Sequence, residues 1–279
     1  MSVFLQKNKI FTTILIGSFL SGIFSVLAYF NVFSSWQLQF GDRLYAGHKP
    51  NSEIVIIEID ENSLNRETGL GNYENWNRGY FAQVLENINK FSPKAVAFDF
   101  FFKTAKDQSG DDRFMQALKN TKTPVIAYLG NKNVYNELPL KLFSDLANVI
   151  IGHTNFLLDQ DGVARRLAPS MYNNITNKYY DSFAFATAKA AFGNDNKNLT
   201  IPLENGQMLI NFASVPGKSH YATLSFVDVY NQNYKPYNID PEKIFKDKIV
   251  LIGPQAFYFK DTYYTPVNKV SQMSGIEIH

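Results

Sequence analysis

Two aspartates that follow strand-like apolar runs are the first candidates for chemistry in this sequence. Asp60 follows "IVIIEI" and Asp99 follows "AVAF". A lone ionised carboxylate in a dry interior is costly unless it is paired or hydrogen-bonded. Each aspartate is therefore expected either to have a partner or to lie where its strand leaves the core.

Both aspartates would lie at the carboxyl ends of strands, where ligands gather in parallel sheets. If the two strands are neighbours, Asp60 and Asp99 would lie close together, where they could bind Mg²⁺ or Ca²⁺ or raise the pKa of one partner. The alternative is that each aspartate caps the following turn or pairs with a basic residue such as Arg78. We favour this fastening role, and binding stays open.

A second acidic motif is "LDQDGVARR", with Asp159, Asp161 and Gly162 in a D-x-D-G pattern. It resembles the start of a calcium-binding loop, but the later ligands of such a loop are missing. A β-turn between two strands, with Gly162 at positive φ, explains the pattern more simply. Arg165, beyond the turn, could pair with an acid or an anionic ligand, although a solvated side chain is the simpler expectation.

Other signatures of chemistry are missing from the sequence. The four histidines, at 48, 153, 220 and 279, form no H-x-x-x-H pattern, which argues against a zinc hydrolase. There is no G-x-S-x-G motif, and no G-x-G-x-x-G opens a helix. The chain has no cysteine and hence no disulfide or thiolate site. A net charge of +2 without a basic stripe argues against nucleic-acid binding.

The element order begins with a long apolar segment, Ile10 to Phe33, which contains no charge and no proline. As a helix at about 1.5 Å per residue it would span roughly 36 Å, enough to cross a bilayer. Lys7 and Lys9 precede it, and the positive flank is expected to stay in the cytoplasm. We therefore predict a cytoplasmic segment (1–9), a transmembrane signal anchor (10–33) and an extracytoplasmic part (34–279) at the plasma (inner) membrane. A cleaved signal peptide is the alternative, and it would export the same residues.

The exported part alternates strand-like and helix-like stretches. Expected strands are Glu53–Asp60, Lys94–Phe102, Pro124–Gly130, Asn148–Phe156, Gln207–Ala213 and Asp247–Pro254. Expected helices are Gly79–Phe91, Asp111–Asn120, Asp181–Gly193 and Ser225–Asn231. This order predicts one α/β domain with a mostly parallel sheet covered by helices.

Taken in order, these segments resemble the type-two CHASE domain, an extracellular sensory domain found with adenylate cyclases, histidine kinases and other signalling outputs. The resemblance covers roughly residues 36 to 279. It rests on the ordered series "FGDRLY", "IVIIEIDENSL", "NWNRGYFAQVLENI", "PKAVAFDFFF", "DDRFMQAL", "IGHTNFLLDQDGVARR", "INFA", "DKIVLIGPQA", "DTYYTPV" and "SGIEIH". Trp76 is flanked by Asn75 and Asn77, where the family usually has a proline-rich run.

The resemblance implies a membrane-anchored sensor that relays an unknown signal, a small molecule or an envelope ligand, to a cytoplasmic cyclase, kinase or similar output beyond this chain. It implies no enzyme activity in these residues, and no cofactor or metal is expected. A homodimer is a further expectation. The polar set proposed to bind a ligand or hold the fold consists of Asp60, Asp99, Asp112 and Asp261, with Arg78 and Arg165 as counter-charges. The alternatives are an exported metal-dependent hydrolase at the Asp60–Asp99 edge and a non-catalytic cell-envelope scaffold.

Overall fold

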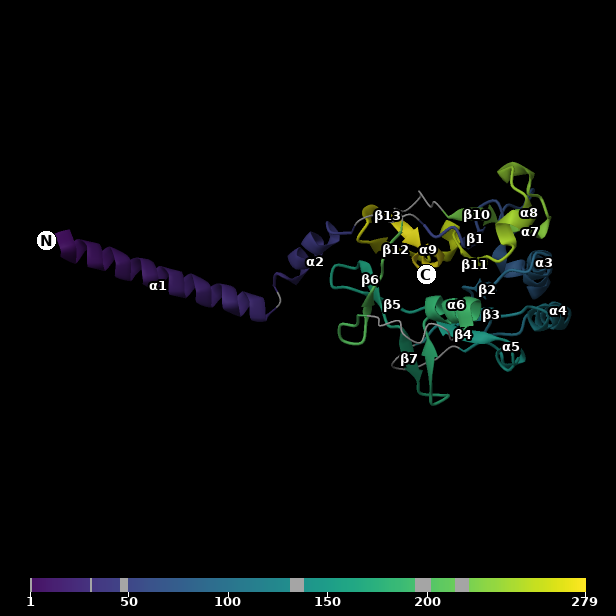
Figure 1. The fold of residues 1–279 in the computed structure, drawn as a ribbon, viewed down its shortest axis with the longest axis horizontal. Coiled ribbons are helices and arrows are strands. Elements are labelled where there is room, and N and C mark those ends of the chain that lie inside the picture. Colours follow the sequence, from purple (N-terminus) through teal and green to yellow (C-terminus); the bar gives the residue numbers. More distant parts are fainter. Residues whose placement is uncertain (1, 31, 46–49, 131–137, 194–201, 214–220) are drawn as a thin grey trace. The chain divides into compact units, whose positions relative to one another are not determined.

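A computed structural model describes residues 2–30, 32–45, 50–130, 138–193, 202–213 and 221–279 (Figure 1). The chain divides into two compact units, Met1–Ala46 and Gly47–His279. The first unit holds a long helix and a short one, and the second holds the sheet and every other helix and strand described.

The first unit begins with α1 (Ser2–Tyr29), whose stretch Lys9–Tyr29 is long and apolar enough to cross a membrane. Its apolar side chains, such as Phe11 and Phe19, are exposed, as they would be in contact with lipid. α1 ends at Tyr29, before the end of the predicted span at Phe33, and a second helix, α2 (Ser34–Asp42), follows.

The second unit is built on a sheet of six parallel strands in the order β10-β1-β11-β2-β3-β4. In that order the strands are Ala222–Ser225, Ile54–Ile59, Ile249–Pro254, Ala95–Phe98, Pro124–Tyr128 and Ile150–His153. Their residues are mostly apolar and buried, because helices cover both faces of a parallel sheet. The predicted α/β architecture with a parallel sheet is confirmed.

The two faces of the sheet pack into two separate cores. Alternate residues of each strand point to opposite faces, so Ile57 joins one core and Ile56 the other. The larger core is covered by α3 (Arg78–Asn89), α4 (Gln108–Lys119), α5 (Lys141–Ser144), α7 (Phe226–Tyr230) and α8 (Pro241–Phe245). The smaller core is covered by α6 (Phe183–Phe192) and α9 (Gly275–Ile278) (Figure 1).

The helix boundaries follow from local capping. The side chain of Asn77 accepts a hydrogen bond from Gly79 N (2.8 Å) at the start of α3, and the side chain of Asp107 does the same for Gly110 N (2.7 Å) at the start of α4. Ser182 caps α6, which ends at Gly193 with φ +69°, as its sequence predicts.

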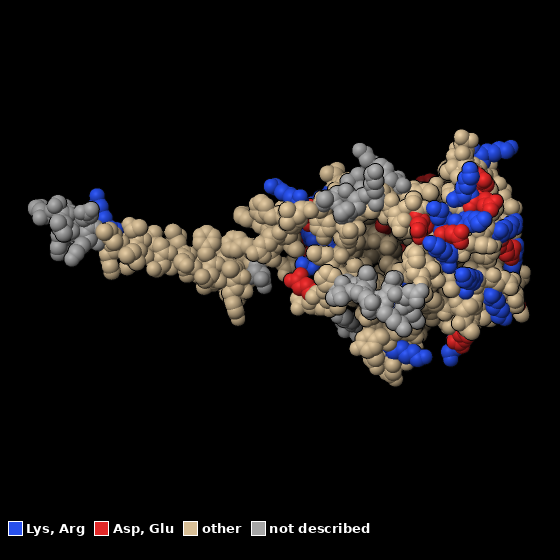
Figure 2. All heavy atoms as spheres, viewed as in Figure 1, with Lys and Arg blue, Asp and Glu red and all other residues tan. Residues whose placement is uncertain are grey.

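Charged side chains of both signs gather over the end of the second unit formed by α3, α4 and α8 (Figure 2). Arg113 on α4 pairs with Glu86 on α3 at 2.7 Å, and Lys246 pairs with Glu242 on α8 at 3.1 Å. These exposed pairs form a mixed, solvated surface and contribute little to stability.

Shorter strands extend from the carboxyl ends of β4 and β11. After β4 the chain forms an antiparallel group of β5 (Phe156–Leu158), β6 (Ala164–Leu167) and β9 (Met208–Leu209), and a hairpin of β7 (Ser170–Asn173) and β8 (Lys178–Asp181). After β11 it forms the pair β12 (Thr262–Thr265) and β13 (Asn268–Ser274). The expected strand Asn148–Phe156 is therefore divided between two sheets, and Gln207–Ala213 contributes only the two residues of β9.

Candidate functional site

The strand order separates the two aspartates that the sequence suggested as a pair. β11 lies between β1 and β2, in parallel register with both. Asp60 after β1 and Asp99 after β2 are thus not on neighbouring strands, and the expectation that they form one carboxylate pair is wrong. The shared Asp60–Asp99 edge on which a metal-dependent hydrolase would depend is not formed.

Asp60 fastens the loop after β1 to the neighbouring strand β10. Its Oδ1 atom accepts hydrogen bonds from Ser63 N (2.9 Å), from Ser63 Oγ (2.6 Å) and from Ser225 Oγ (2.7 Å). Asp60 therefore has the contacts of a turn cap, which is the role we favoured from the sequence.

Asp99 lies directly beside the end of β11, where its backbone N–H donates to Ile252 O at 2.8 Å. The residue is only 7% exposed, and its carboxylate is close to a second acid, Asp261, on the segment after β11. Burial, and then repulsion by Asp261, raise the pKa of Asp99 well above its ordinary value. Burial also raises the pKa of Asp261, although the Tyr263 hydroxyl donates a hydrogen bond to it.

His279 is the third titratable group at this place. Its Nε2 atom is 3.9 Å from Asp99 Oδ2, and its Nδ1 atom is buried without a hydrogen-bond partner in the described part of the chain. Its ring stacks on Phe156, with ring centroids 4.5 Å apart, and meets Phe183 edge-on at 5.1 Å. Burial, followed by the nearby His153, lowers the pKa of His279 to about 3, so the imidazole is uncharged at neutral pH.

Asp99, Asp261 and His279 line a cavity of about 460 Å³. It lies beyond the carboxyl ends of β11, β2, β3 and β4, the edge at which parallel sheets bind ligands. The remaining lining residues are Tyr73, Phe100, Phe101, Lys103, Leu129, Thr154, Phe156, Pro254, Phe259, Lys260 and Tyr263. The cavity therefore combines two poorly compensated acids with mostly aromatic walls.

Arg78 binds Asp111 rather than Asp60 or Asp99, the two aspartates for which it was considered as a partner. Its Nη1 atom is 3.0 Å from Asp111 Oδ1, and its Nη2 atom donates to Thr104 O at 2.5 Å. Both charged side chains are 5% exposed, and the guanidinium lies over the rings of Phe102 and Phe143. Asp112, the neighbour of Asp111 in the sequence, is exposed instead.

Arg165 is buried, which corrects the expectation of a solvated side chain. It pairs with Asp159 at 3.0 Å and with Asp161 at 2.8 Å, and its own side chain is 3% exposed. These are the two acids of the D-x-D-G motif, and Gly162 takes φ +75° in the turn between β5 and β6. The expected β-turn is confirmed, and its acids hold an arginine. The hydrogen bond from Arg165 lowers the pKa of Asp161.

A second pair of acids, both half-buried, lies between β1 and α9 and was not predicted. Glu58 on β1 faces Glu277 on α9, and burial, then Glu277, then Asp60, raise the pKa of Glu58 to about 7. Burial also raises the pKa of Glu277, despite the hydrogen bond from Ser274 Oγ at 3.4 Å. The sequence did contain a signal for Glu58, because it is the one charged residue in the apolar run Ile54–Ile59.

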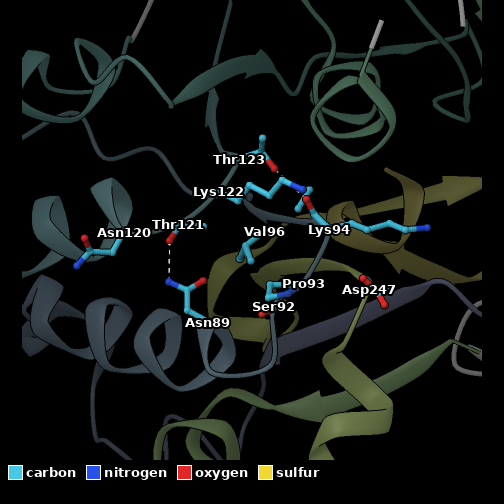
Figure 3. Close-up of a pocket in the computed structure, with 11 residues that line it drawn as sticks. Asn89, Ser92, Pro93, Lys94, Val96, Asn120, Thr121, Lys122, Thr123 and Asp247 are labelled. Atoms are coloured by element: carbon cyan, nitrogen blue, oxygen red, sulfur yellow. Dashed lines mark hydrogen bonds between the residues drawn. The ribbon is translucent and has the colours of Figure 1, made fainter. Parts of the chain in front are cut away.

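The opposite edge of the sheet has another cavity, of about 280 Å³, at the amino ends of β2 and β3 (Figure 3). Its polar side chains bond to other groups of the domain: Asn89 Nδ2 donates to Thr121 Oγ1 (2.9 Å), Thr123 Oγ1 to Lys94 O (2.9 Å) and Lys94 Nζ to Glu53 Oε2 (2.9 Å). These bonds fasten loops, and the other polar residues that line this cavity are exposed: Ser92, Asn120, Lys122 and Asp247. The candidate functional site is therefore the cavity of Asp99, Asp261 and His279.

Within the described residues, no group of three or more His, Cys, Asp or Glu side chains could hold a metal ion. His48 and His220 lie outside the described residues.

A sequence model of the CHASE2 domain matches residues 13–279. Searches of curated proteins and of solved structures each found no match.

Proposed function

The chain belongs to the CHASE2 domain family, and from that membership we propose that it is a membrane-anchored extracytoplasmic sensor whose signal binds the cavity of Asp99, Asp261 and His279. CHASE2 domains are extracellular sensory domains. The apolar helix Lys9–Tyr29 supplies a segment that can cross the plasma membrane. The basic residues Lys7 and Lys9 favour an orientation with the second unit outside.

One observation carries the ligand-binding part of the proposal. Asp99 is a buried carboxylate without a hydrogen-bond partner for its side chain among the described residues, and it lines a cavity. A buried acid without compensation costs stability, so a fold retains it more readily where the acid has a role. Asp60, Asp111 and Asp161 differ from Asp99, because each is satisfied by the protein itself.

The relay would start at α9. This helix packs on β11, where Gly253 lets Ile276 approach the strand, and it places His279 in the cavity wall. A ligand that binds Asp99 would therefore act on α9 directly. In a longer chain the residues after His279 would transmit that change to a cytoplasmic output such as a cyclase or kinase.

The test uses the full chain in lipid nanodiscs and a panel of amines, carboxylic acids, sugars and nucleotides. Binding is followed by thermal shift, and α9 by hydrogen exchange. We expect one class to raise the melting temperature and to change exchange in α9, and Asp99→Asn to weaken that binding while Asp112→Asn does not. The proposal is wrong if no class binds, if Asp99→Asn leaves binding unchanged, or if binding leaves exchange in α9 unchanged.

A further inference from the structure

We infer that this cavity binds a small organic cation, a protonated amine carried on an aromatic or branched apolar body, and this inference rests on the proposed sensory function. The ammonium group would lie between Asp99 and Asp261, and the apolar body would lie against the aromatic walls. Three features of the cavity carry the inference: its charge, its walls and its size.

Among the described residues, the cavity holds two acids without a basic partner, and a bound cation would favour their ionised forms. In the described part of the chain, no lysine or arginine forms an ion pair with Asp99 or Asp261. The basic group nearest to Asp99 is His279, which burial keeps neutral. Lys103 and Lys260 lie in the wall but are exposed, whereas Asp99 is buried. A ligand with a positive charge would supply the counter-charge that the protein does not.

The walls are rich in aromatic rings. Tyr73, Phe100 and Phe259 form one group, with Tyr73 at 6.0 Å from Phe100 and 4.9 Å from Phe259 between ring centroids. Phe156 and Tyr263 form a second pair at 5.2 Å. Ring faces attract organic cations, and they also bury the apolar part of such a molecule.

The size and the ligand atoms favour an organic molecule over a metal ion. A volume of about 460 Å³ is within the range of about 300 to 1,000 Å³ that small-molecule sites occupy. Calcium takes about six to eight oxygen ligands, whereas this cavity offers two carboxylates, and the described residues contain no group of three metal-ligating side chains.

The experiment is calorimetric titration of the full chain in nanodiscs with three probes of one shape. Phenethylamine is the cation, phenethyl alcohol the neutral control and hydrocinnamic acid the anion. We expect the amine to bind about tenfold or more tightly than the alcohol, because a charge-assisted hydrogen bond is about twice as strong as a neutral one, and the acid to bind weakest. Asp99→Asn and Asp261→Asn should each remove most of the preference for the amine, and Asp112→Asn should leave it intact.

The wild-type comparison decides the inference even if a cavity variant does not fold. Equal binding of amine and alcohol, tighter binding of the acid, or displacement of the amine by Mg²⁺ or Ca²⁺ would overturn it. If a sugar or nucleotide binds instead, depends on Asp99 and changes hydrogen exchange in α9, then the sensory proposal stands and the amine inference falls. If no probe and no panel compound binds, both fall.

Discussion

The guanidinium of Arg78 is buried among phenylalanine rings and depends on Asp111 for its counter-charge. Asp111 also accepts a hydrogen bond from Lys106 N at 3.0 Å, which ties the loop before α4 to the same carboxylate. A buried ion pair adds little to stability when it is compared with apolar residues, but breaking it strands a charge. Comparing substitutions at Asp111 and at its neighbour Asp112 therefore tests which of the two aspartates holds Arg78.

Asp111→Asn should lower the free energy of unfolding by about 3 to 5 kcal/mol, because it leaves Arg78 buried and unpaired. Asp112→Asn should change it by less than about 0.5 kcal/mol, because Asp112 is exposed. Urea unfolding can be followed by the fluorescence of Trp76, which is buried in the larger core. Equal losses in the two variants would contradict this assignment.

The choice between these two aspartates could be made from the sequence. Asp111 is three residues before Phe114 and seven before Leu118, which places it on the buried face of α4. The predicted polar set contains Asp112, which is one position away from this face and exposed to solvent. The grouping of Asp99, Asp261 and His279 had no such signal, because it depends on where β11 enters the sheet and where α9 packs.

At the scale of elements, the packing of α9 on the sheet creates a pH dependence through Glu58. Its pKa rises from 4.5 to about 7 on folding, because of burial and of Glu277 and Asp60 nearby. As pH rises, the unfolded chain loses this proton first, so the stability from the protonated form is lost between about pH 4.5 and 7. Tyr221 is the further titratable group that interacts with Glu277.

Glu58→Gln should therefore raise the melting temperature at pH 8 relative to wild type and change it less at pH 5. The matched control is Glu67→Gln, an exposed glutamate on the loop after β1. Differential scanning calorimetry at the two pH values measures both variants. A Glu58→Gln gain that is equal at pH 5 and pH 8 would show that ionisation of Glu58 does not oppose folding.

The contact of α9 with β11 depends on a glycine. A Cβ atom at Gly253 would come within 2.7 Å of Ile276 Cβ and Cγ1, so Gly253→Ala forces α9 away from the strand. We expect a loss of about 1 to 3 kcal/mol in thermal or urea unfolding. In an Ile276→Ala background, Gly253→Ala should cost less than it does in the wild type, because alanine at 276 removes the close contacts with Cγ1 and Cδ1 and leaves only the one with Cβ. Additive losses in the double variant would contradict this account of the contact.

Five of the six strands of the parallel sheet were predictable because their apolar runs are local signals, whereas β10 (Ala222–Ser225) was not predicted. The chain order strand, helix, strand, helix, strand gave the correct class, and Gly193 and Gly162 stood at the predicted ends and turns. Residues Asn148–Phe156 are predicted as one strand because none of them is an acid, a lysine or an arginine. In the structure it is divided where the chain leaves the sheet after His153, and periodicity does not encode that exit.

At the scale of the whole molecule, the order of the strands in the sheet could not be predicted from local sequence patterns. β11 comes last in the sequence among the strands of the six-stranded sheet, yet it lies between β1 and β2. This insertion separates Asp60 from Asp99 and brings Asp261 and α9 to the cavity instead. Local patterns predict individual strands, but pairing between strands that are far apart in the sequence decides which acidic side chains lie close together.

The orientation of the chain in the membrane is testable with single cysteines, because the sequence has none of its own. We expect Lys178→Cys, on an exposed residue of the β7–β8 hairpin, to react in intact cells with a membrane-impermeant maleimide. Ser2→Cys should react only after the membrane is permeabilised, because the basic residues Lys7 and Lys9 keep the preceding segment in the cytoplasm. Labelling is measured by gel shift, with Asn173→Cys, a buried residue on β7, as the control for accessibility. Reaction of Ser2→Cys in intact cells, together with protection of Lys178→Cys, would reverse the orientation and remove the basis for an extracytoplasmic sensor.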